Sequence, residues 1–249
     1  MLTDQAPARA LDPTPLLEAL DFVREHQDQA DHFGGTGDER DFYHLLDRLS
    51  DGVSRSFRSY CRAGCGGCCH YPIAMFTTTF TEWDVVRRYI ETEYTQAQRV
   101  ALVRRYRATF TGFWRLVLTF LQRSSLMLVV TAPAVYRAQI ACPFLVDSSC
   151  SVYPARPYQC RTFGLFAVRE FAHQPKVYAC NVQGENLLAQ TQAAGPQVQL
   201  PVSNAIAARI RLMCQGPKLS LPIWAGIWVS RWEAGRAVPG EGRHLLEET

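Results

Sequence analysis

Several features common in other protein classes are missing from this 249-residue sequence, and each absence narrows the interpretation. The longest apolar stretch, residues 113–130, is interrupted by Arg115, Gln122 and Arg123. A bilayer span needs about 18 or more uninterrupted apolar residues, so we expect no membrane span. The opening residues MLTDQAPARALD have no basic and then apolar pattern, which predicts a cytoplasmic protein without a secretory signal.

Catalytic and nucleic-acid signatures are also missing. The sequence contains no glycine-rich phosphate loop, no G-x-S-x-G nucleophile elbow and no H-E-x-x-H zinc-protease pattern. Only Lys176 and Lys218 are lysines, and the arginines match no nucleic-acid-binding motif. No enzyme class follows from a motif, and we expect no nucleic-acid partner.

Cysteine is absent from the first 60 residues and the last 35, yet the chain holds nine. In a reducing compartment, clustered cysteines more often bind metal or carry out redox chemistry than form disulfides. The odd count also argues against a complete disulfide set. Cys214 stands alone on a predicted helical face, and we interpret it as a packing residue. The predicted metal ligands are Cys61, Cys65, Cys68, Cys69, Cys142, Cys150, Cys160 and Cys180.

The first block, residues 61–69, has the spacing of a metal-binding turn. Cysteines two to four residues apart can place their sulfurs about 2.3 Å from one zinc ion, and the glycines between them let the backbone curl around the site. Adjacent Cys68 and Cys69 point to opposite sides of an extended chain. They therefore serve two metals, or one ligates while the other supports. His70 either replaces a thiolate or hydrogen-bonds nearby, and the second role is the commoner one.

The second block, residues 142–180, is too widely spaced for one turn and predicts loops that return to a common centre. Eight thiols could form two four-cysteine sites. A four-thiolate zinc site and a [4Fe–4S] cluster in its usual state have the same formal charge, so charge does not distinguish them. We predict that Arg156 and Arg161 bind near the cofactor and neutralise it. One alternative is that both arginines bind a substrate anion. The other, which is the commoner one, is a structural role as partners of backbone carbonyls or thiolates, with Tyr153 and Tyr158 as packing residues.

The ordered second block also carries a resemblance. It reads CPFL at 142–145, CSVY at 150–153, RP at 156–157 and CR at 160–161, before Cys180. Together with the first block, this resembles the YkgJ-type cysteine-cluster family, described as a zinc- or iron-chelating domain, over residues 61–181. The block is also similar to that of flagellin lysine N-methylases, where an iron–sulfur cluster is implied. The resemblance implies metal binding and leaves the reaction open.

Apolar residues at three- and four-residue steps predict a mainly α-helical protein. The expected inward faces are Leu16, Leu20 and Val23; Phe42, Leu46, Leu49, Val53 and Tyr60; Trp83, Val86, Ile90 and Tyr94; and Val103, Tyr106, Phe110, Phe113 or Trp114, Val117 and Leu121. The helices pack around an irregular cysteine-rich metal-binding core, with at most a few short strands. Thr95 and Gln98 match a capping box. One helix is expected to begin at Thr14. Further helices are expected at about Asp41–Tyr60, Thr81–Tyr94, Thr95 to about Gln122, 186–191 and 204–213, and in the tail that contains Trp224, Trp228 and Trp232.

Further local expectations concern strands, turns and surfaces. Residues 71–76 and 163–171 are candidate strands, and 32–37 and 147–149 are expected to be loop or turn. Glu82, Asp84, Glu91 and Glu93 are expected on a solvated helix face. We divide the chain into an N-terminal helical segment (1–60), a cysteine-cluster metal-binding domain with inserted long helices (61–181) and a C-terminal helical extension (182–249).

The leading interpretation is a metal-binding protein that holds an iron–sulfur cluster or zinc through the two cysteine blocks. The vicinal cysteines and the count of eight thiols favour iron–sulfur, although the spacing differs from the common ferredoxin patterns. One alternative is a cluster-dependent protein N-methyltransferase that resembles flagellin lysine N-methylase. The other is a zinc-stabilised interaction module, whose partner would be a protein. Whether the protein is an enzyme stays open at this point.

Overall fold

The computed structural model describes residues 11–61, 64–70, 76–121, 141–168, 176–194, 200–201, 208–209, 212–214 and 218–235. The chain forms two compact units, each built from two separated segments. Unit 1 comprises Met1–Cys68 and Tyr158–Met213, and unit 2 comprises Cys69–Pro157 and Cys214–Thr249. The division into three consecutive segments at residues 60/61 and 181/182 stays a prediction.

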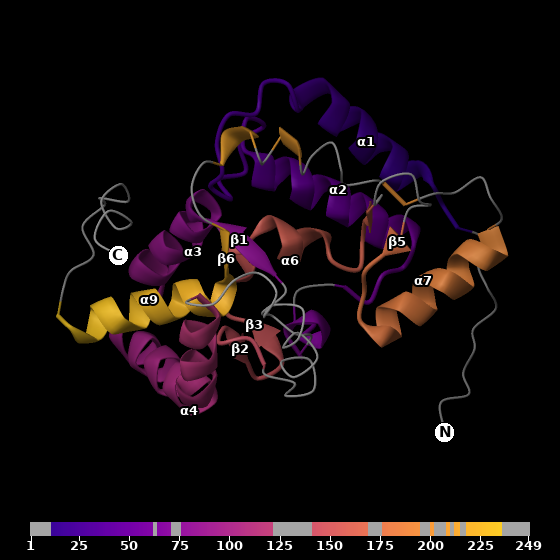
Figure 1. Cartoon of the computed structure of the whole chain (residues 1–249). Helices are drawn as coiled ribbons and strands as arrows, with labels where there is room; N and C mark the ends of the chain where they lie inside the picture. Colours follow the sequence, from indigo (N-terminus) through magenta and orange to yellow (C-terminus); the bar gives the residue numbers. More distant parts are fainter. Residues whose placement is uncertain are drawn as a thin grey trace. The chain divides into compact units, whose positions relative to one another are not determined.

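The described part of the chain contains seven α-helices and only short antiparallel strand pairs, which confirms the mainly α fold with a few short strands (Figure 1). In unit 1 the elements are α1 (Thr14–His26), α2 (Phe42–Ser56), α6 (Tyr158–Thr162), β4 (Ala167–Val168), β5 (Lys176–Val177) and α7 (Asn181–Ala194). In unit 2 they are β1 (Thr77–Thr79), α3 (Phe80–Glu93), α4 (Gln96–Leu121), β2 (Leu145–Val146), β3 (Ser149–Cys150), η3 (Tyr153–Ala155), β6 (Lys218–Ser220) and α9 (Leu221–Glu233). The 3-10 helix η1 (Gly67–His70) contains the boundary between the units.

Helices α1 and α2 lie side by side in unit 1 (Figure 1). On the predicted apolar face of α1, Leu16 and Val23 are buried in the core and Leu20 is half-buried. Gly52 of α2 allows the close approach, because an added Cβ would lie 2.7 Å from Ala19 Cβ. The two helix backbones therefore meet at a position where only glycine fits without displacement.

Helix α2 differs from its predicted extent at the C-terminal end. It ends at Ser56 and not near Tyr60, and Arg58 has a positive φ of 43°. A left-handed backbone cannot continue a right-handed helix. Tyr60 is 57% exposed, so its place in the predicted apolar stripe was wrong.

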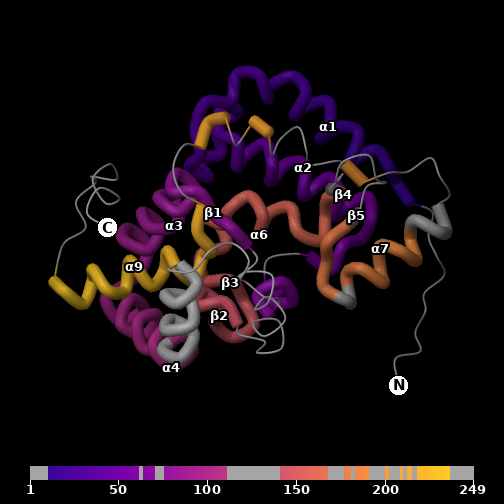
Figure 2. Tube along the Cα trace, in the orientation of Figure 1, coloured from indigo at the N-terminus to yellow at the C-terminus, as the bar shows by residue number. Residues whose placement is uncertain are grey.

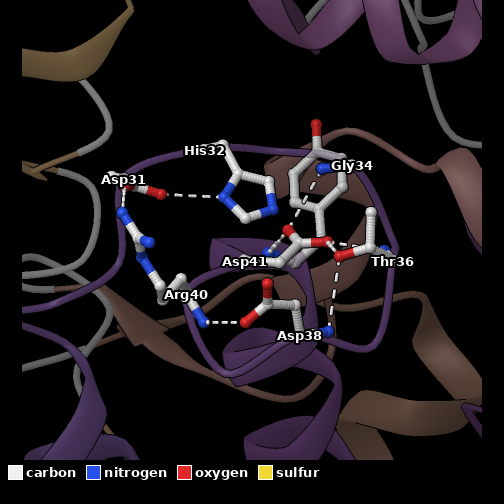
Figure 3. A network of polar contacts seen from close by, with 8 residues as sticks. Asp31, His32, Gly34, Thr36, Asp38, Arg40 and Asp41 are labelled. Atoms are coloured by element: carbon white, nitrogen blue, oxygen red, sulfur yellow. Dashed lines mark hydrogen bonds and ion pairs between the residues drawn. The ribbon is translucent and has the colours of Figure 1, made fainter.

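The loop before α2 is organised by the buried carboxylate of Asp41, the N-cap residue of that helix. Asp41 Oδ1 accepts hydrogen bonds from the backbone N–H of Gly34 at 3.1 Å and Tyr43 at 2.8 Å. Asp41 Oδ2 accepts from the backbone N–H of Thr36 at 2.7 Å and its hydroxyl at 3.0 Å (Figure 3). One carboxylate thus caps the helix and closes the predicted 32–37 loop.

Helix α3 begins at Phe80, one residue before the expected Thr81. The residue that caps it is Thr79, and Glu82 reaches back to the Thr79 backbone N–H at 3.0 Å in a capping box. This pairing buries Glu82, which is 4% exposed, so its predicted position on a solvated face was wrong. The predicted apolar face of α3 is buried, as expected: Trp83, Val86, Ile90 and Tyr94.

Helix α4 starts with the predicted Thr95 and Gln98 pair. The Thr95 backbone N–H donates to Gln98 Oε1 at 2.7 Å, and the Gln98 backbone N–H donates to Thr95 Oγ1 at 3.3 Å. Val103, Tyr106 and Phe110 are buried, as predicted. The side chains expected inward beyond them, at positions 113–121, lie outside the residues whose side chains the structure describes.

Helix α9 packs against α3 and α4 within unit 2 (Figure 2). The Tyr106 hydroxyl donates to the Pro222 carbonyl at 3.0 Å. Trp224 Nε1–H donates to the Thr78 carbonyl at 2.9 Å, and the Trp224 ring stacks on Trp83. The tryptophan-containing tail is therefore a core helix of unit 2.

The remaining local predictions concern one turn, two candidate strands and two helices. Asp147 and Ser148 both have positive φ in a two-residue turn that joins β2 to β3, which confirms the turn at 147–149. Residues 71–75 of the first candidate strand lie outside the described residues. Of the second candidate strand, 163–171, the described part contains only the short strand β4 at Ala167–Val168. The helix expected at 186–191 is longer and begins at Asn181, whereas most of 204–213 is outside the described residues. Among the described helices, none has the length and apolar character needed to cross a membrane.

Candidate metal centre

The structure places Cys180, from the second block, near three cysteines of the first block. Burial raises the pKa of the Cys61 thiol to about 12; a hydrogen bond with Ser59 lowers it, and the charges of Cys65, Cys180 and Cys68 raise it further. All four cysteines belong to unit 1. The first candidate set of ligands is therefore Cys61, Cys65, Cys68 and Cys180, and not the four consecutive cysteines of the first block.

Two glycines make room for these sulfur atoms. A Cβ added at Gly67 would lie 3.2 Å from Cys180 Sγ and 3.6 Å from Cys65 Sγ. The Gly67 backbone thus lies against two sulfurs at once, as expected for a glycine inside a metal-binding turn.

Gly164 likewise leaves space beside the Cys61 sulfur. Its φ is +78°, and an added Cβ would lie 3.0 Å from Cys61 Sγ. The position therefore requires glycine for its backbone conformation and for the space beside the sulfur. The sequence interpretation missed Gly164; an isolated glycine shortly after a short helix is the signal that could have indicated it.

A second group of cysteines lies in unit 2. Cys69 and Cys142 are both buried, and the Cys142 backbone N–H donates to the Cys69 carbonyl at 2.8 Å. Cys150, at the end of the β2–β3 hairpin, lies close enough to Tyr94 for its charge to raise the tyrosine pKa. Burial is the larger cause of that shift, which takes the Tyr94 pKa to about 12. Cys160 lies on α6 in unit 1.

The two predicted cofactor-binding arginines have described partners in the protein. Arg161 is buried, forms an ion pair with Asp47 of α2 and lies over the Tyr43 ring at 4.1 Å from its centroid. Arg156 lies over the Tyr153 ring at 3.5 Å, and its Nε donates to the Tyr153 carbonyl at 3.0 Å. These contacts match the structural alternative, whereas the cofactor role stays a prediction.

Three further residues considered in the sequence are His70, Cys214 and Tyr153. His70 is exposed at the end of η1. Cys214 is buried, and burial raises its pKa, which agrees with its interpretation as a packing residue. Tyr153 carries the stacked Arg156, consistent with a packing role.

The donor chemistry of the first set suits a thiolate-bound metal, because four cysteines and two glycine cradles meet in one unit. Within the described residues, no group of three or more His, Cys, Asp or Glu side chains is already arranged as a metal-ion site.

Comparison with known proteins supports metal chelation. Residues 60–181 match the family model CxxCxxCC, whose description is "Putative zinc- or iron-chelating domain". The searches of curated proteins and of solved structures found no significant match. The resemblances to YkgJ-type proteins and to flagellin lysine N-methylases stay predictions. The matched residues include all eight candidate cysteine ligands, so the region is similar to a domain that chelates zinc or iron.

Proposed function

We propose that this protein binds an iron–sulfur cluster through Cys61, Cys65, Cys68 and Cys180. The observation that carries the proposal is the grouping of these four thiols in unit 1, where each of the other three influences the charge state of Cys61. The match to a zinc- or iron-chelating domain supports the metal class. Zinc held by the same thiolates is the competing form of the proposal.

The surroundings of the thiols fit the charge that ligation creates. When bound, the cluster would supply electron transfer or Lewis-acid chemistry, and the four residues would hold it as thiolates. Cys180 directly precedes α7, whose N-terminal end carries partial positive charge. Gly67 and Gly164 keep side-chain carbon away from the sulfurs. Binding must displace the Cys61 proton, so affinity should rise with pH.

The remaining predicted ligands are Cys69, Cys142, Cys150 and Cys160. We propose that Cys69, Cys142 and Cys150 contribute to a second centre in unit 2, because the first two have adjacent backbones and the third ends the following hairpin. Cys160 stays a predicted ligand that we assign to neither centre. Arg156 and Arg161 are retained as predicted neighbours of the bound group.

Elemental and acid-labile sulfide analysis of protein purified without oxygen tests the proposal. We expect iron and sulfide in similar amounts, and a large loss of both in Cys65→Ser. The matched control is Cys214→Ser, which removes a buried thiol from outside the candidate sites. Zinc at integer stoichiometry without iron or sulfide would reject the cluster in favour of zinc. Absence of both metals would refute metal binding.

A further inference from the structure

Gln183 is a fully buried polar residue on α7, one turn beyond Cys180. Both polar atoms of its side-chain amide form hydrogen bonds. Oε1 accepts from the Tyr60 backbone N–H at 2.9 Å, and Nε2 donates to the Gly164 carbonyl at 3.0 Å. A buried amide with both partners satisfied fixes two backbone segments at once.

Both segments touch the candidate centre. Tyr60 directly precedes Cys61, and Gly164 is the glycine that packs against Cys61 Sγ. The Gly164 backbone N–H also donates to the Tyr178 carbonyl at 2.8 Å, close before Cys180. The Gln183 amide therefore links the backbone at Cys61 to the helix that follows Cys180, through contacts that lie entirely within unit 1.

Few other side chains could replace this link. The two partners are a donor and an acceptor, and only an amide presents both functions at neutral charge with this geometry. A glutamate would retain the acceptor for Tyr60 but would lose the donor and add negative charge close to the thiols. A leucine of similar size would leave the buried Gly164 carbonyl and the part-buried Tyr60 N–H without this partner.

We propose that Gln183 is a positioning residue that sets the separation of Cys61 and Cys180 for metal binding. The proposal rests on the proposed function. Residues that hold metal ligands in place commonly change metal affinity by 10–100-fold when they are replaced. Gln183 lies outside the ligand set, so its replacement should weaken the centre without removing a sulfur.

The test measures the rate at which EDTA removes iron or zinc from Gln183→Leu protein purified without oxygen. We expect metal loss about 10–100-fold faster than in the parent protein. The matched control is Gln190→Leu on the same helix, where the lost hydrogen bond goes from Gln190 Nε2 to Asn186 Oδ1 and no described contact involves a cysteine. Gln190→Leu should lose metal at the parent rate.

Unfolding of the metal-free and metal-loaded proteins separates positioning from plain stability. Positioning predicts that Gln183→Leu reduces the stability gained on metal loading, whereas a merely structural role lowers both stabilities equally. Gln183→Glu, which preserves shape and the Tyr60 contact, provides the same comparison if the leucine variant does not fold. In the unchanged protein, metal loading should slow hydrogen exchange at the Tyr60 amide.

The outcomes distinguish the two proposals. A parent protein that carries no metal refutes the proposed function. A parent protein that carries metal, with equal metal loss from the Gln183 and Gln190 variants and no change in Tyr60 exchange on loading, overturns the positioning role alone.

Discussion

The partly buried Cys61 thiol shows how one side chain can couple folding to pH. Its pKa is raised from 9.0 to about 12, chiefly by burial. A raised folded-state pKa stabilises the folded protein fully below the unfolded-state value, and this contribution is lost as pH rises from about 9 through about 12. Metal-free protein should therefore lose stability across this window.

Urea denaturation of the metal-free protein at several pH values above 8 measures this loss. The difference between the parent protein and Cys61→Ala isolates the thiol from tyrosines and lysines that titrate in the same range. We expect the parent to lose more stability than the variant as pH rises. Parallel pH profiles for the two proteins would contradict the raised pKa of the Cys61 thiol.

Gly164 and Gly37 offer a comparison between backbone strain and contact with the candidate centre. Both have positive φ, +78° and +79°, but only at Gly164 would a Cβ meet Cys61 Sγ, at 3.0 Å, whereas nothing lies within 4 Å at Gly37. Substitution by alanine should cost each about 1–2 kcal/mol of stability through the left-handed backbone. Only Gly164→Ala should also lower metal content, as determined by elemental analysis. Equal metal content in both variants would argue against the proximity of Gly164 to the centre.

At the residue scale, the sequence identified the candidate ligands but not their grouping. The short spacing of Cys61, Cys65 and Cys68 predicted that they lie together. The addition of Cys180 depends on a long-range return of the chain, and no spacing rule predicts it. Gln183 gave no signal at all, because a glutamine in a helix is ordinary until its two backbone partners are seen.

Among the elements, α2 depends most on a single side chain. Asp41 accepts four hydrogen bonds from the loop and the helix start while buried. Removal takes the acceptor away from the buried Tyr43 N–H and the part-buried Gly34 and Thr36 N–H groups. Asp41→Ala should therefore cost about 2–4 kcal/mol, combining the loss of an N-cap with the loss of hydrogen bonds to a charged acceptor. Urea denaturation of the variant measures this change.

Asp38→Ala is the control for this prediction, because Asp38 is exposed and its carboxylate accepts from the Arg40 backbone N–H (Figure 3). Its loss should cost less than about 1 kcal/mol. Similar losses for the two aspartates would show that the Asp41 network does not hold the loop and helix together.

Helix boundaries illustrate what local patterns can and cannot specify. The Thr95 and Gln98 pair has the capping-box spacing and was predicted from it. The same spacing joins Thr79 to Glu82, yet Thr81 was expected to begin α3 because it directly precedes Glu82. Glu82 is buried because its carboxylate turns back to the cap, an effect that a count of charges along the helix face does not reveal.

At the scale of the whole molecule, the boundary between the units falls between two adjacent cysteines. Cys68 belongs to unit 1 with the first candidate centre, and Cys69 belongs to unit 2, where its carbonyl pairs with Cys142. Each unit is assembled from two segments that are distant in sequence, so the chain's linear order did not predict this division. This division agrees with the proposal that the vicinal pair serves two centres, which is one of the two alternatives that the sequence left open.

Separate substitution of the two neighbours tests this arrangement. Cys68→Ser should remove the metal that Cys65→Ser also removes, because both residues belong to the proposed unit 1 centre. Cys69→Ser should leave that metal in place and deplete only the remainder. Metal and sulfide analysis of the single variants and of Cys65→Ser combined with Cys69→Ser measures the two portions. If the adjacent substitutions remove the same portion, and the double variant loses no more than Cys65→Ser alone, the two cysteines serve one centre and the proposed division between units is wrong.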